Sequence, residues 1–184
     1  MRIIGGKLKG KKLARIRGTK IRPTADRLRE AIFNILADRV KDAFVLDLFA
    51  GSGACGIEAL SRGAQFAVFV DNSKESITTI KNNVRSCGYE QCSETIRWDI
   101  LKNLNCIGAY DRGFDLVFLD PPYNTNCITP TLIKLHRKNT LVRGGCIVIE
   151  HSYHEGVPSD IGDFRAMDGR RYGQALVTFL SCGP

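Results

Sequence analysis

The residues best suited to chemistry follow an apolar run that ends at residue 119. The run 114–119 is typical of a buried strand, and Asp120, Pro121, Pro122 and Tyr123 come directly after it. Two adjacent prolines cannot continue a strand ladder because neither has an N–H to donate. The chain must therefore leave the sheet in a stiff, extended conformation, which fixes a carboxylate and an aromatic ring. A lone Pro-Pro corner is an ordinary rigid turn, so its surroundings decide whether it forms a site.

The chemistry that suits this corner is methylation of an exocyclic amine on a nucleic-acid base. Such an amine is a poor nucleophile because its lone pair is delocalised into the ring. Asp120 and the carbonyl of Pro121 would accept the two amine hydrogens and favour a tetrahedral nitrogen, while Tyr123 would stack on the extruded base. Rate enhancement would then come from orientation and fixed dipoles, with no metal ion and no covalent intermediate.

A second motif, a glycine-rich turn, follows the apolar run 43–49. Gly51, Gly53 and Gly56 have the G-x-G-x-x-G spacing that lets backbone approach a nucleotide at a helix N-terminus. The spacing alone is a weak signal, but this turn also opens a helix. In addition, Asp71 ends the next strand, where a carboxylate can hold the two hydroxyls of a ribose. The motif therefore predicts a nucleotide cofactor.

Asp47, just before this turn, distinguishes between nucleotide cofactors. A carboxylate there would repel the pyrophosphate of NAD but could attract the amino group and sulfonium of S-adenosylmethionine. Asp47 could also be a helix-dipole partner or a buried acid at a strand end. Asp99, expected to end the third strand, could accept a hydrogen bond from the adenine amino group or be a surface acid. These positions favour S-adenosylmethionine.

The surrounding elements must bring these residues together. The expected strands and helices, in chain order, are a strand at 43–49, a helix at 53–62, a strand at 66–71, a helix at 73–86, strands at 95–99 and 114–120, a helix opening at Thr129-Pro130, and strands at 146–151, 163–168 and 175–180. Continuous apolar strands separated by helices predict a doubly wound, Rossmann-like α/β fold with a mostly parallel sheet of seven strands. Ligands bind such sheets at the carboxyl ends of the strands. Asp47, Asp71, Asp99 and Asp120 are expected to meet there.

The positive charge is concentrated at the start of the chain. The net charge is +8, and residues 1–30 carry eleven Lys or Arg against Asp26 and Glu30, whereas the rest is nearly neutral. Apolar residues and glycines alternate with these charges, which favours an ordered β-ribbon that can track phosphates with little loss of entropy. A helix is expected at 24–38 with Thr24 as its N-cap. A boundary near residue 42 would separate an RNA-binding extension, 1–42, from a catalytic domain, 43–184.

Composition limits the class of protein. The chain has 184 residues, 43% hydrophobic and 25% charged, as expected for a soluble globular protein. We expect no membrane helix and no secretory signal. Seven scattered cysteines, none spaced C-x-x-C, argue against a disulfide framework or a zinc site and favour a reducing cytoplasm. His151 and His154 lack a third ligand and predict a surface turn, and Cys55 is expected to be an apolar filler. A monomer is expected.

The combined motifs resemble a known family. D-P-P-Y together with D-x-F-A-G-S-G resembles the amino-methyltransferases that act on nucleic-acid bases. More narrowly, RIIGGKLKGKKL, IRPTADRLREAIFNIL and LDLFAGSGACGIEALSRGA are similar to the bacterial 16S ribosomal RNA guanine-N2 methyltransferases of the RsmD type. The resemblance covers nearly the whole chain. It implies a class I methyltransferase fold, S-adenosylmethionine as donor, and a guanine in RNA of the small subunit or an assembly intermediate as acceptor.

Matching positions carry roles over to single residues. The resemblance implies that Asp120 and Tyr123 hold the target base. Residues expected to bind the cofactor are Asp47, Phe49, Gly51, Gly53, Asp71, Asn72, Asp99 and Thr24. Residues expected to contact RNA, or to lie where it enters, are Lys7, Lys9, Lys11, Lys12, Arg22, Arg27 and Arg29. The resemblance also includes the segment 170–173, which it implies is a turn.

Three other functions stay open. A DNA adenine-N6 or cytosine-N4 methyltransferase would share the chemistry, but an arm of about forty residues leaves little room for a duplex-reading domain. An NAD-dependent oxidoreductase would share the glycine turn and Asp71, but it leaves Asp47 and the Pro-Pro corner unexplained. A non-catalytic RNA-binding or ribosome-assembly factor would need only the basic arm.

Overall fold

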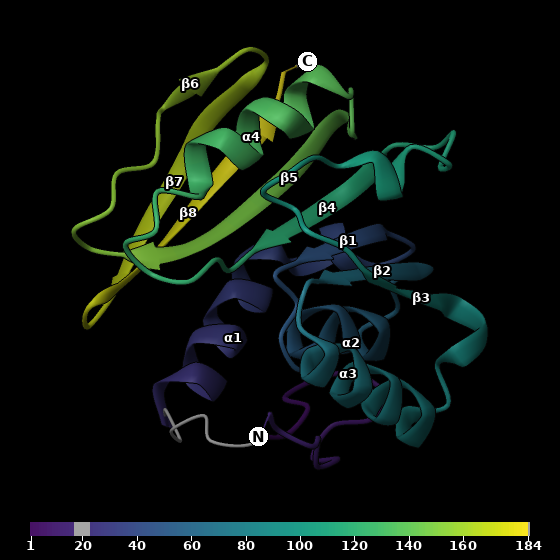
Figure 1. Ribbon diagram of the computed structural model, residues 1–184. Coiled ribbons are helices and arrows are strands. Elements are labelled where there is room, and N and C mark those ends of the chain that lie inside the picture. Colours follow the sequence, from purple (N-terminus) through teal and green to yellow (C-terminus); the bar gives the residue numbers. More distant parts are fainter. Residues whose placement is uncertain (17–22, 184) are drawn as a thin grey trace.

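The computed structural model describes residues 1–16 and 23–183 (Figure 1). The helices and strands, in chain order, are α1 (Pro23–Leu36), β1 (Phe44–Leu48), α2 (Ala54–Ser61), β2 (Phe66–Asp71), α3 (Lys74–Cys87), β3 (Ser93–Arg97), β4 (Phe114–Leu119), α4 (Ile128–Arg137), β5 (Leu141–Ser152), β6 (Asp160–Ile161), β7 (Phe164–Tyr172) and β8 (Ala175–Cys182). Short 3₁₀ helices lie at Ala37–Val40, Glu90–Cys92 and Asn105–Ile107. Within these described residues, no helix combines the length and hydropathy that crossing a bilayer requires.

The strands form one sheet in the order β3-β2-β1-β4-β5-β8-β7-β6. The first five strands of this order are parallel, and β8, β7 and β6 continue it antiparallel. The predicted doubly wound, mostly parallel α/β fold is confirmed. The described residues form eight strands instead of the expected seven, because β6 has only two residues and leaves no periodic pattern in the sequence.

Helices cover both faces of this sheet, with α1, α2 and α3 on one face and α4 on the other (Figure 1). The first hydrophobic cluster contains buried residues from each of the three helices on that face, for example Leu28, Ile57 and Ile80. The second cluster, on the other face, contains Leu132 of α4. Because successive strand residues point to opposite faces, the central strands must be apolar at every position. That requirement explains why the bounds of β1, β2 and β4 could be predicted to within a residue.

Some predicted boundaries need correction. The third strand, β3, ends at Arg97 and not at Asp99, although the N–H of Trp98 still donates to the carbonyl of Asp71 at 3.0 Å. Strand β5 begins at Leu141, five residues before the expected start. The final helix begins at Ile128, so Thr129 lies inside it. The early start of β5 has a partner on the neighbouring strand, since Leu141 lies opposite Phe114 of β4, and local periodicity cannot show such pairing.

The N-terminal arm, residues 1–16, is a compact loop and not the expected β-ribbon. Its antiparallel pairing is a single bridge between Arg2 and Lys12, within the residues that the structure describes. Ile3 and Leu13 are buried in the cluster on the helical face shared with α1, α2 and α3. The first helix begins at Pro23, so Thr24 is not its N-cap, and the Thr24 side chain lies outside the described residues. The arm thus shares a core with the body.

Candidate active site

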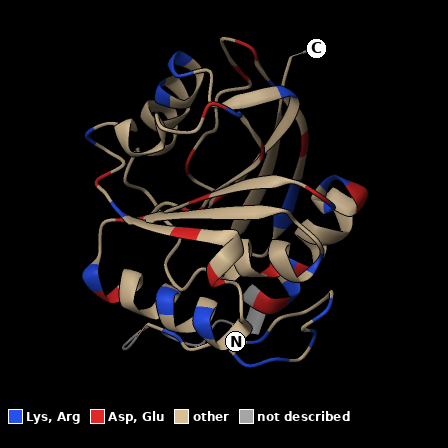
Figure 2. Ribbon diagram, turned by 90° about the vertical axis from the view of Figure 1, so that its right-hand side faces the viewer, with Lys and Arg blue, Asp and Glu red and all other residues tan. Residues whose placement is uncertain are grey.

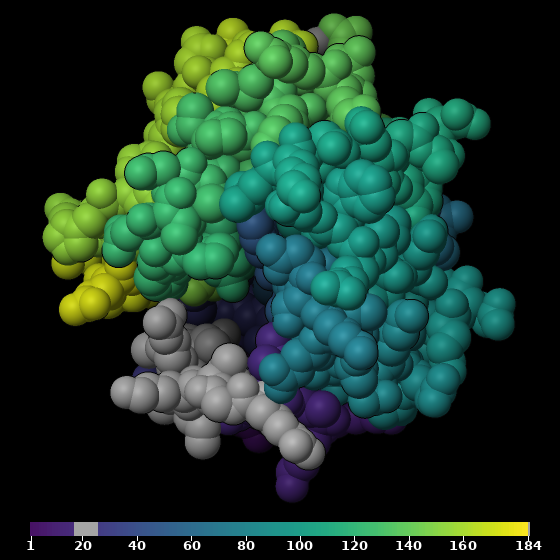
Figure 3. Space-filling model, in the orientation of Figure 1, coloured from purple at the N-terminus to yellow at the C-terminus, as the bar shows by residue number. Residues whose placement is uncertain are grey.

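The carboxyl ends of four neighbouring strands form one row. Leu48 of β1 lies opposite Val70 of β2 and Leu119 of β4, and Leu119 lies opposite Ile149 of β5. The residues that follow these four positions are Phe49, Asp71, Asp120 and Glu150. Figure 3 shows a hollow on this face, with green residues of the segment after β4 on one side and blue to teal residues of the segment after β2 on the other. The expected meeting of strand-end acids is therefore observed for Asp71 and Asp120.

The glycine turn depends on conformations that other residues avoid. Gly51 and Gly53 have φ angles of +57° and +76°, and Gly53 lies at the N-terminus of α2. Phe49 also has a positive φ, 56°, which is a strained conformation for a bulky residue. At Gly56 a Cβ atom would overlap the ring of Phe69, so only glycine lets α2 approach β2 this closely. The third glycine of the motif therefore serves packing.

Asp71 joins the glycine turn to the start of α3. It is 9% exposed, and its two oxygens accept the N–H groups of Gly51 and Ser73, each at 2.9 Å. The next residue, Asn72, is exposed and lines an open depression together with Arg97, Trp98 and Asp99. Asp99 itself accepts the N–H of Leu101 at 3.0 Å through Oδ1. Asp71 is thus held rigidly, and the depression beside it leaves room for a planar ring.

Asp47 lies beneath this turn. Its side chain is 4% exposed and accepts the N–H of Gly56 at 2.9 Å. Burial raises the pKa of Asp47 to about 7, the hydrogen bond from Gly56 opposes this, and the charge of Asp71 adds to it. At neutral pH Asp47 is therefore close to the midpoint of its titration. The hydrogen bond from Gly56 makes Asp47 a buried partner of α2.

The D-P-P-Y segment is held from two sides. Asp120 and Pro122 are exposed and Pro121 is buried, while the hydroxyl of Tyr123 donates to Oε1 of Glu150 at 2.8 Å. The loop continues through Asn124 and Asn126, which have φ angles of 58° and 54°. Prolines limit the backbone before Tyr123, and a hydrogen bond fixes its ring from the neighbouring strand. The corner is rigid, as its sequence predicts.

A buried acid, Glu155, completes the support of this loop. It is 8% exposed, and its oxygens accept the N–H groups of Asn124 at 2.9 Å and of Asn126 at 3.1 Å. Its own carbonyl lies 2.8 Å from Nδ1 of His151, which is 2% exposed. His151 is therefore a buried structural residue, and its expected place in a surface turn is wrong. Glu150 and Glu155 were not expected from the sequence, although Glu150 follows the apolar run 146–149 just as Asp71 and Asp120 follow theirs.

Cys55 lies in the first turn of α2. Burial raises the pKa of Cys55 well above its ordinary value, and the charges of Asp47, Asp120 and Glu150 raise it further, while Arg29 opposes them. The thiol stays protonated and inert, in line with its expected role as a filler.

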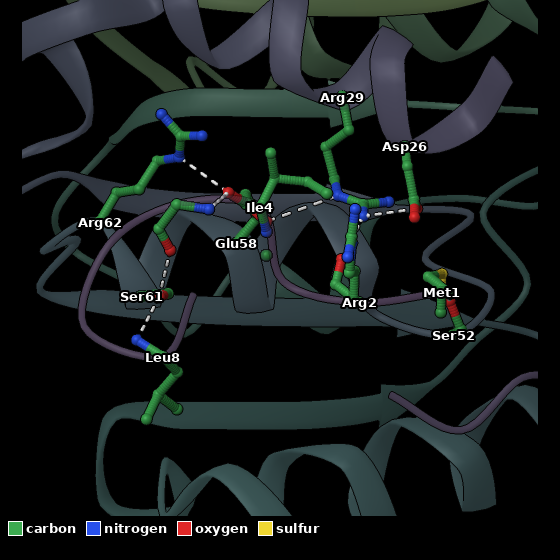
Figure 4. A network of polar contacts seen from close by, with 12 residues as sticks. Met1, Arg2, Ile4, Leu8, Asp26, Arg29, Ser52, Glu58, Ser61 and Arg62 are labelled. Carbon is green, nitrogen blue, oxygen red and sulfur yellow. Dashed lines mark hydrogen bonds and ion pairs between the residues drawn. The ribbon is translucent and has the colours of Figure 1, made fainter. Parts of the chain in front are cut away.

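The arm is attached through its backbone to α2. Glu58, fully buried, accepts the N–H groups of Ile4 and Gly5, both at 2.7 Å (Figure 4). Its carboxylate also pairs with Arg62 at 2.8 Å and with Arg29 at 3.6 Å. Two guanidinium groups and two amides thus compensate one buried charge, as burial requires.

A buried amide links the arm to the glycine turn. Asn83 of α3 is 2% exposed, and its Oδ1 accepts the N–H of Ala14 at 2.7 Å. Its Nδ2 donates to the carbonyls of Ala14 at 3.1 Å and of Ser52, in the turn, at 2.9 Å. The basic arm and the turn that begins α2 are therefore parts of one hydrogen-bonded unit.

The residues expected to contact RNA, apart from Arg29, separate into three groups. Lys7, Lys9, Lys12 and Arg27 are exposed, and Figure 2 shows blue segments along the arm near the N-terminus. Lys11 is partly buried and donates through Nζ to the carbonyl of Ser86. Arg22 lies outside the described residues.

Arg29 requires a correction. It is 5% exposed, donates to the carbonyl of Arg2 at 2.6 Å, and pairs with Asp26 at 3.0 Å. Its guanidinium is held inside the protein between α1, the arm and Glu58, as Figure 4 shows. An RNA phosphate would have to displace these partners, so Arg29 is a structural residue that anchors the arm. Its helical position among charged neighbours gave no sign of this burial.

The expected turn at 170–173 lies mostly in a strand: residues 170–172 belong to β7, and the turn to β8 is formed by residues 173 and 174. Arg170 pairs with Asp168 at 2.9 Å, and the guanidinium of Arg171 lies over the ring of Tyr153, 4.3 Å from its centroid. Tyr153 is 51% exposed. In the ranges 1–16 and 23–183, no group of three or more His, Cys, Asp or Glu is arranged to hold a metal ion.

Comparisons with known proteins agree with this geometry. The model of the family described as Conserved hypothetical protein 95 matches residues 1–181. Ribosomal RNA small subunit methyltransferase D of Haemophilus influenzae is 36% identical over 152 residues, which cover 82% of this chain and 78% of that protein. The protein of the same name from Escherichia coli K12 is 32% identical over 159 residues, covering 86% and 78%.

A solved structure gives the same result for the fold. The Escherichia coli protein yhhF, described as a candidate methyltransferase, superposes with a TM-score of 0.86 at 29% identity and covers 100% of this chain and 98% of its own. The predicted enzyme class, an S-adenosylmethionine-dependent methyltransferase, is confirmed by these relatives. The chain belongs to the Conserved hypothetical protein 95 family, the RsmD family of methyltransferases, as its motifs predicted.

Proposed function

We propose that this protein transfers a methyl group from S-adenosylmethionine to the exocyclic N2 amine of a guanine in 16S ribosomal RNA, within the small subunit or an assembly intermediate. The observation that carries the proposal is that the carboxyl ends of β1, β2 and β4 lie next to one another in the sheet. Asp120 follows β4 beside the glycine turn that follows β1 and the acid that ends β2. The names of the relatives, ribosomal RNA small subunit methyltransferases, support the choice of RNA.

The groups at this edge fit S-adenosylmethionine, which supplies an electrophilic methyl group on a sulfonium when it is bound. A Cβ at Gly51 would have no atom closer than 3.9 Å, so the turn is open above its backbone. Asp71 would hold the ribose, since each carboxylate oxygen can accept more than one hydrogen bond. The depression lined by Asn72, Trp98 and Asp99 would hold the adenine. Asp47, Phe49 and Gly53 would border the methionine part.

The chain's own residues would prepare the amine for attack. Asp120 would accept one amine hydrogen and the carbonyl of Pro121 the other, which holds the nitrogen lone pair toward the methyl group. Tyr123 would stack on the base, with its ring fixed through Glu150. Orientation of two bound reactants and fixed acceptors are the main sources of acceleration in such a site.

The arm would bring the RNA to this site. Lys7, Lys9 and Lys12 project from a backbone that Glu58 and Asn83 hold in place. An ordered basic surface loses little entropy on binding phosphates. We propose that residues 1–42 act as an RNA-binding extension of the domain at 43–184, and that the protein works as a monomer in the cytoplasm, where ribosomes are assembled.

The proposal is tested at Asp120. We expect Asp120→Ala to lower kcat on small ribosomal subunits by about a hundredfold or more, because the fixed acceptor of the amine is lost, while RNA affinity stays unchanged. Asp111→Ala, at an exposed acid away from this edge, is the control and should keep full activity. Mapping N2-methylguanine in ribosomal RNA from cells with and without the protein would locate the base. Full activity of Asp120→Ala, or methylation of plasmid DNA instead of subunits, would refute the proposal.

A further inference from the structure

We propose that Glu150 determines base specificity: with Asp120 it forms a pair of carboxylates that recognises the N1–H and N2 amine of guanine. This inference rests on the proposed function and assigns a role to a residue at the same strand edge. It begins from the hydrogen bond between Tyr123 and Glu150, which joins the D-P-P-Y corner to the end of β5.

The strand register places the two carboxylates side by side. Phe118 lies opposite Val148, and Leu119 lies opposite Ile149, so Asp120 and Glu150 follow on adjacent parallel strands. Phe118 and Val148 both belong to the cluster on the face of α1, α2 and α3. Because side chains alternate between faces, Glu150 of β5 projects toward that same face, and Asp120 directly follows the last residue of β4 beside it.

The same two acids also affect Cys55, in the first turn of α2. Burial is the main cause that raises the pKa of its thiol, and the charges of Asp120 and Glu150 are among those that add to it.

The contact with Tyr123 sets the position of Glu150 relative to a stacked base. Oε1 of Glu150 accepts the Tyr123 hydroxyl at 2.8 Å, and a carboxylate offers about four acceptor positions in all. The same group can thus accept the Tyr123 hydroxyl and also accept a hydrogen bond from the N1–H of a base. A base stacked on Tyr123 would have its edge beside both acids.

Base chemistry then selects guanine. The Watson–Crick edge of guanine presents two neighbouring donors, the N1–H and the N2 amine, and two carboxylates are acceptors only. Adenine and cytosine instead present a ring nitrogen lone pair beside their amine, which would face the Glu150 carboxylate and be repelled. Such an unfavourable contact is an effective source of discrimination. The pair of acids therefore explains selectivity for guanine, whereas a single acid would accept a hydrogen bond from any exocyclic amine.

The test uses 2-aminopurine in place of the target guanine, in small-subunit RNA with the base that mapping identifies. This base keeps the N2 amine but has a lone pair at N1 and lacks O6. We expect the wild-type protein to prefer guanine in kcat/KM by roughly 10- to 100-fold, the value of one charge-assisted hydrogen bond. In Glu150→Gln the side-chain amide can donate to the N1 lone pair, so the preference should fall toward unity. Comparing the ratios between proteins cancels the contribution of O6.

A matched control comes from a second Tyr–Glu pair. Tyr110 donates to Glu94 on β3, at the far edge of the sheet, so Glu94→Gln makes the same change away from the base and should keep the wild-type ratio. Tyr123→Phe removes the hydroxyl and keeps the ring, and its reduced preference would show that Tyr123 orients Glu150. Should Glu150→Gln fail to fold, Glu150→Asp withdraws the carboxylate and should also lower the preference.

The outcomes separate this inference from the proposed function. An unchanged ratio in the Glu150 variants, or equal rates of the wild-type protein on both bases, would overturn the role of Glu150 while leaving guanine methylation intact. Failure of the wild-type protein to methylate guanine at all would instead overturn the proposed function.

Discussion

Two irregular segments border the candidate site, and they are held in the same way but face different directions. In the arm, Glu58 accepts two successive backbone N–H groups, those of Ile4 and Gly5. In the loop after D-P-P-Y, Glu155 accepts the N–H groups of Asn124 and Asn126. The arm directs charged side chains to solvent, whereas the loop follows a tyrosine that is bonded to the neighbouring strand.

The difference teaches how one small fold can separate binding from chemistry. Glu58 also pairs with Arg29 and Arg62, so its charge is compensated inside the protein and the exposed lysines stay available to a partner. Glu155 holds backbone beside Tyr123, so its effect is to fix reacting groups. Changes in the arm should therefore alter RNA affinity and stability, and changes in the loop should alter turnover.

The largest effect should come from the two anchoring glutamates. Glu58→Gln leaves the buried Arg29 and the partly buried Arg62 without their carboxylate and should lower the free energy of unfolding by about 3–5 kcal/mol. The isosteric Glu155→Gln should lower it by about 1–3 kcal/mol, since neutral hydrogen bonds replace charge-assisted ones. Urea unfolding measures both losses. Trypsin should cut the arm faster in Glu58→Gln only, and equal losses in the two variants would contradict the contrast.

A third buried acid, Asp47 between the two segments, gives a pH-dependent effect. Its pKa is about 7 in the folded protein against 3.8 ordinarily, so the folded state keeps a proton that the unfolded chain has lost. Stability from this group is therefore fully present below about pH 4 and is lost as the pH rises to about 7, at up to about 1.4 kcal/mol per pH unit. Asp47→Asn cannot ionise, so its unfolding free energy should lack this decline. A constant difference between the two proteins across that range would argue against the raised pKa.

The smallest effect should be a change in salt dependence caused by the arm. The double variant Lys9→Gln with Lys12→Gln should make the slope of log affinity for RNA against log salt less steep by about 1.5 to 2. Each phosphate contact that is lost means that fewer counterions are released when the protein binds RNA. Lys11 is omitted because it donates to the carbonyl of Ser86. The control, Arg137→Gln with Lys138→Gln, changes two exposed basic residues at the end of α4, on the other face of the sheet from the arm. An equal change of slope in the control would mean that the lysines of the arm contribute no more to RNA binding than other exposed basic residues.

The sequence by itself determined the central sheet. The second strand was predicted at its observed bounds, 66–71, because a strand covered on both faces must be apolar throughout. It also determined that Asp71 and Asp120 would share an edge, since parallel strands bring their carboxyl ends together. By contrast, the two-residue β6 and the single bridge of the arm have too few residues to leave a periodic pattern.

Only the tertiary structure decided which charges are exposed and which serve as anchors. Arg29 and Arg27 are two residues apart on one helix, yet the first is buried against Glu58 and the second is exposed. The partners of Ile4 and Tyr123 lie 54 and 27 positions away along the chain. No local pattern records such pairs, because a buried charge is tolerated only where distant groups arrive to compensate it.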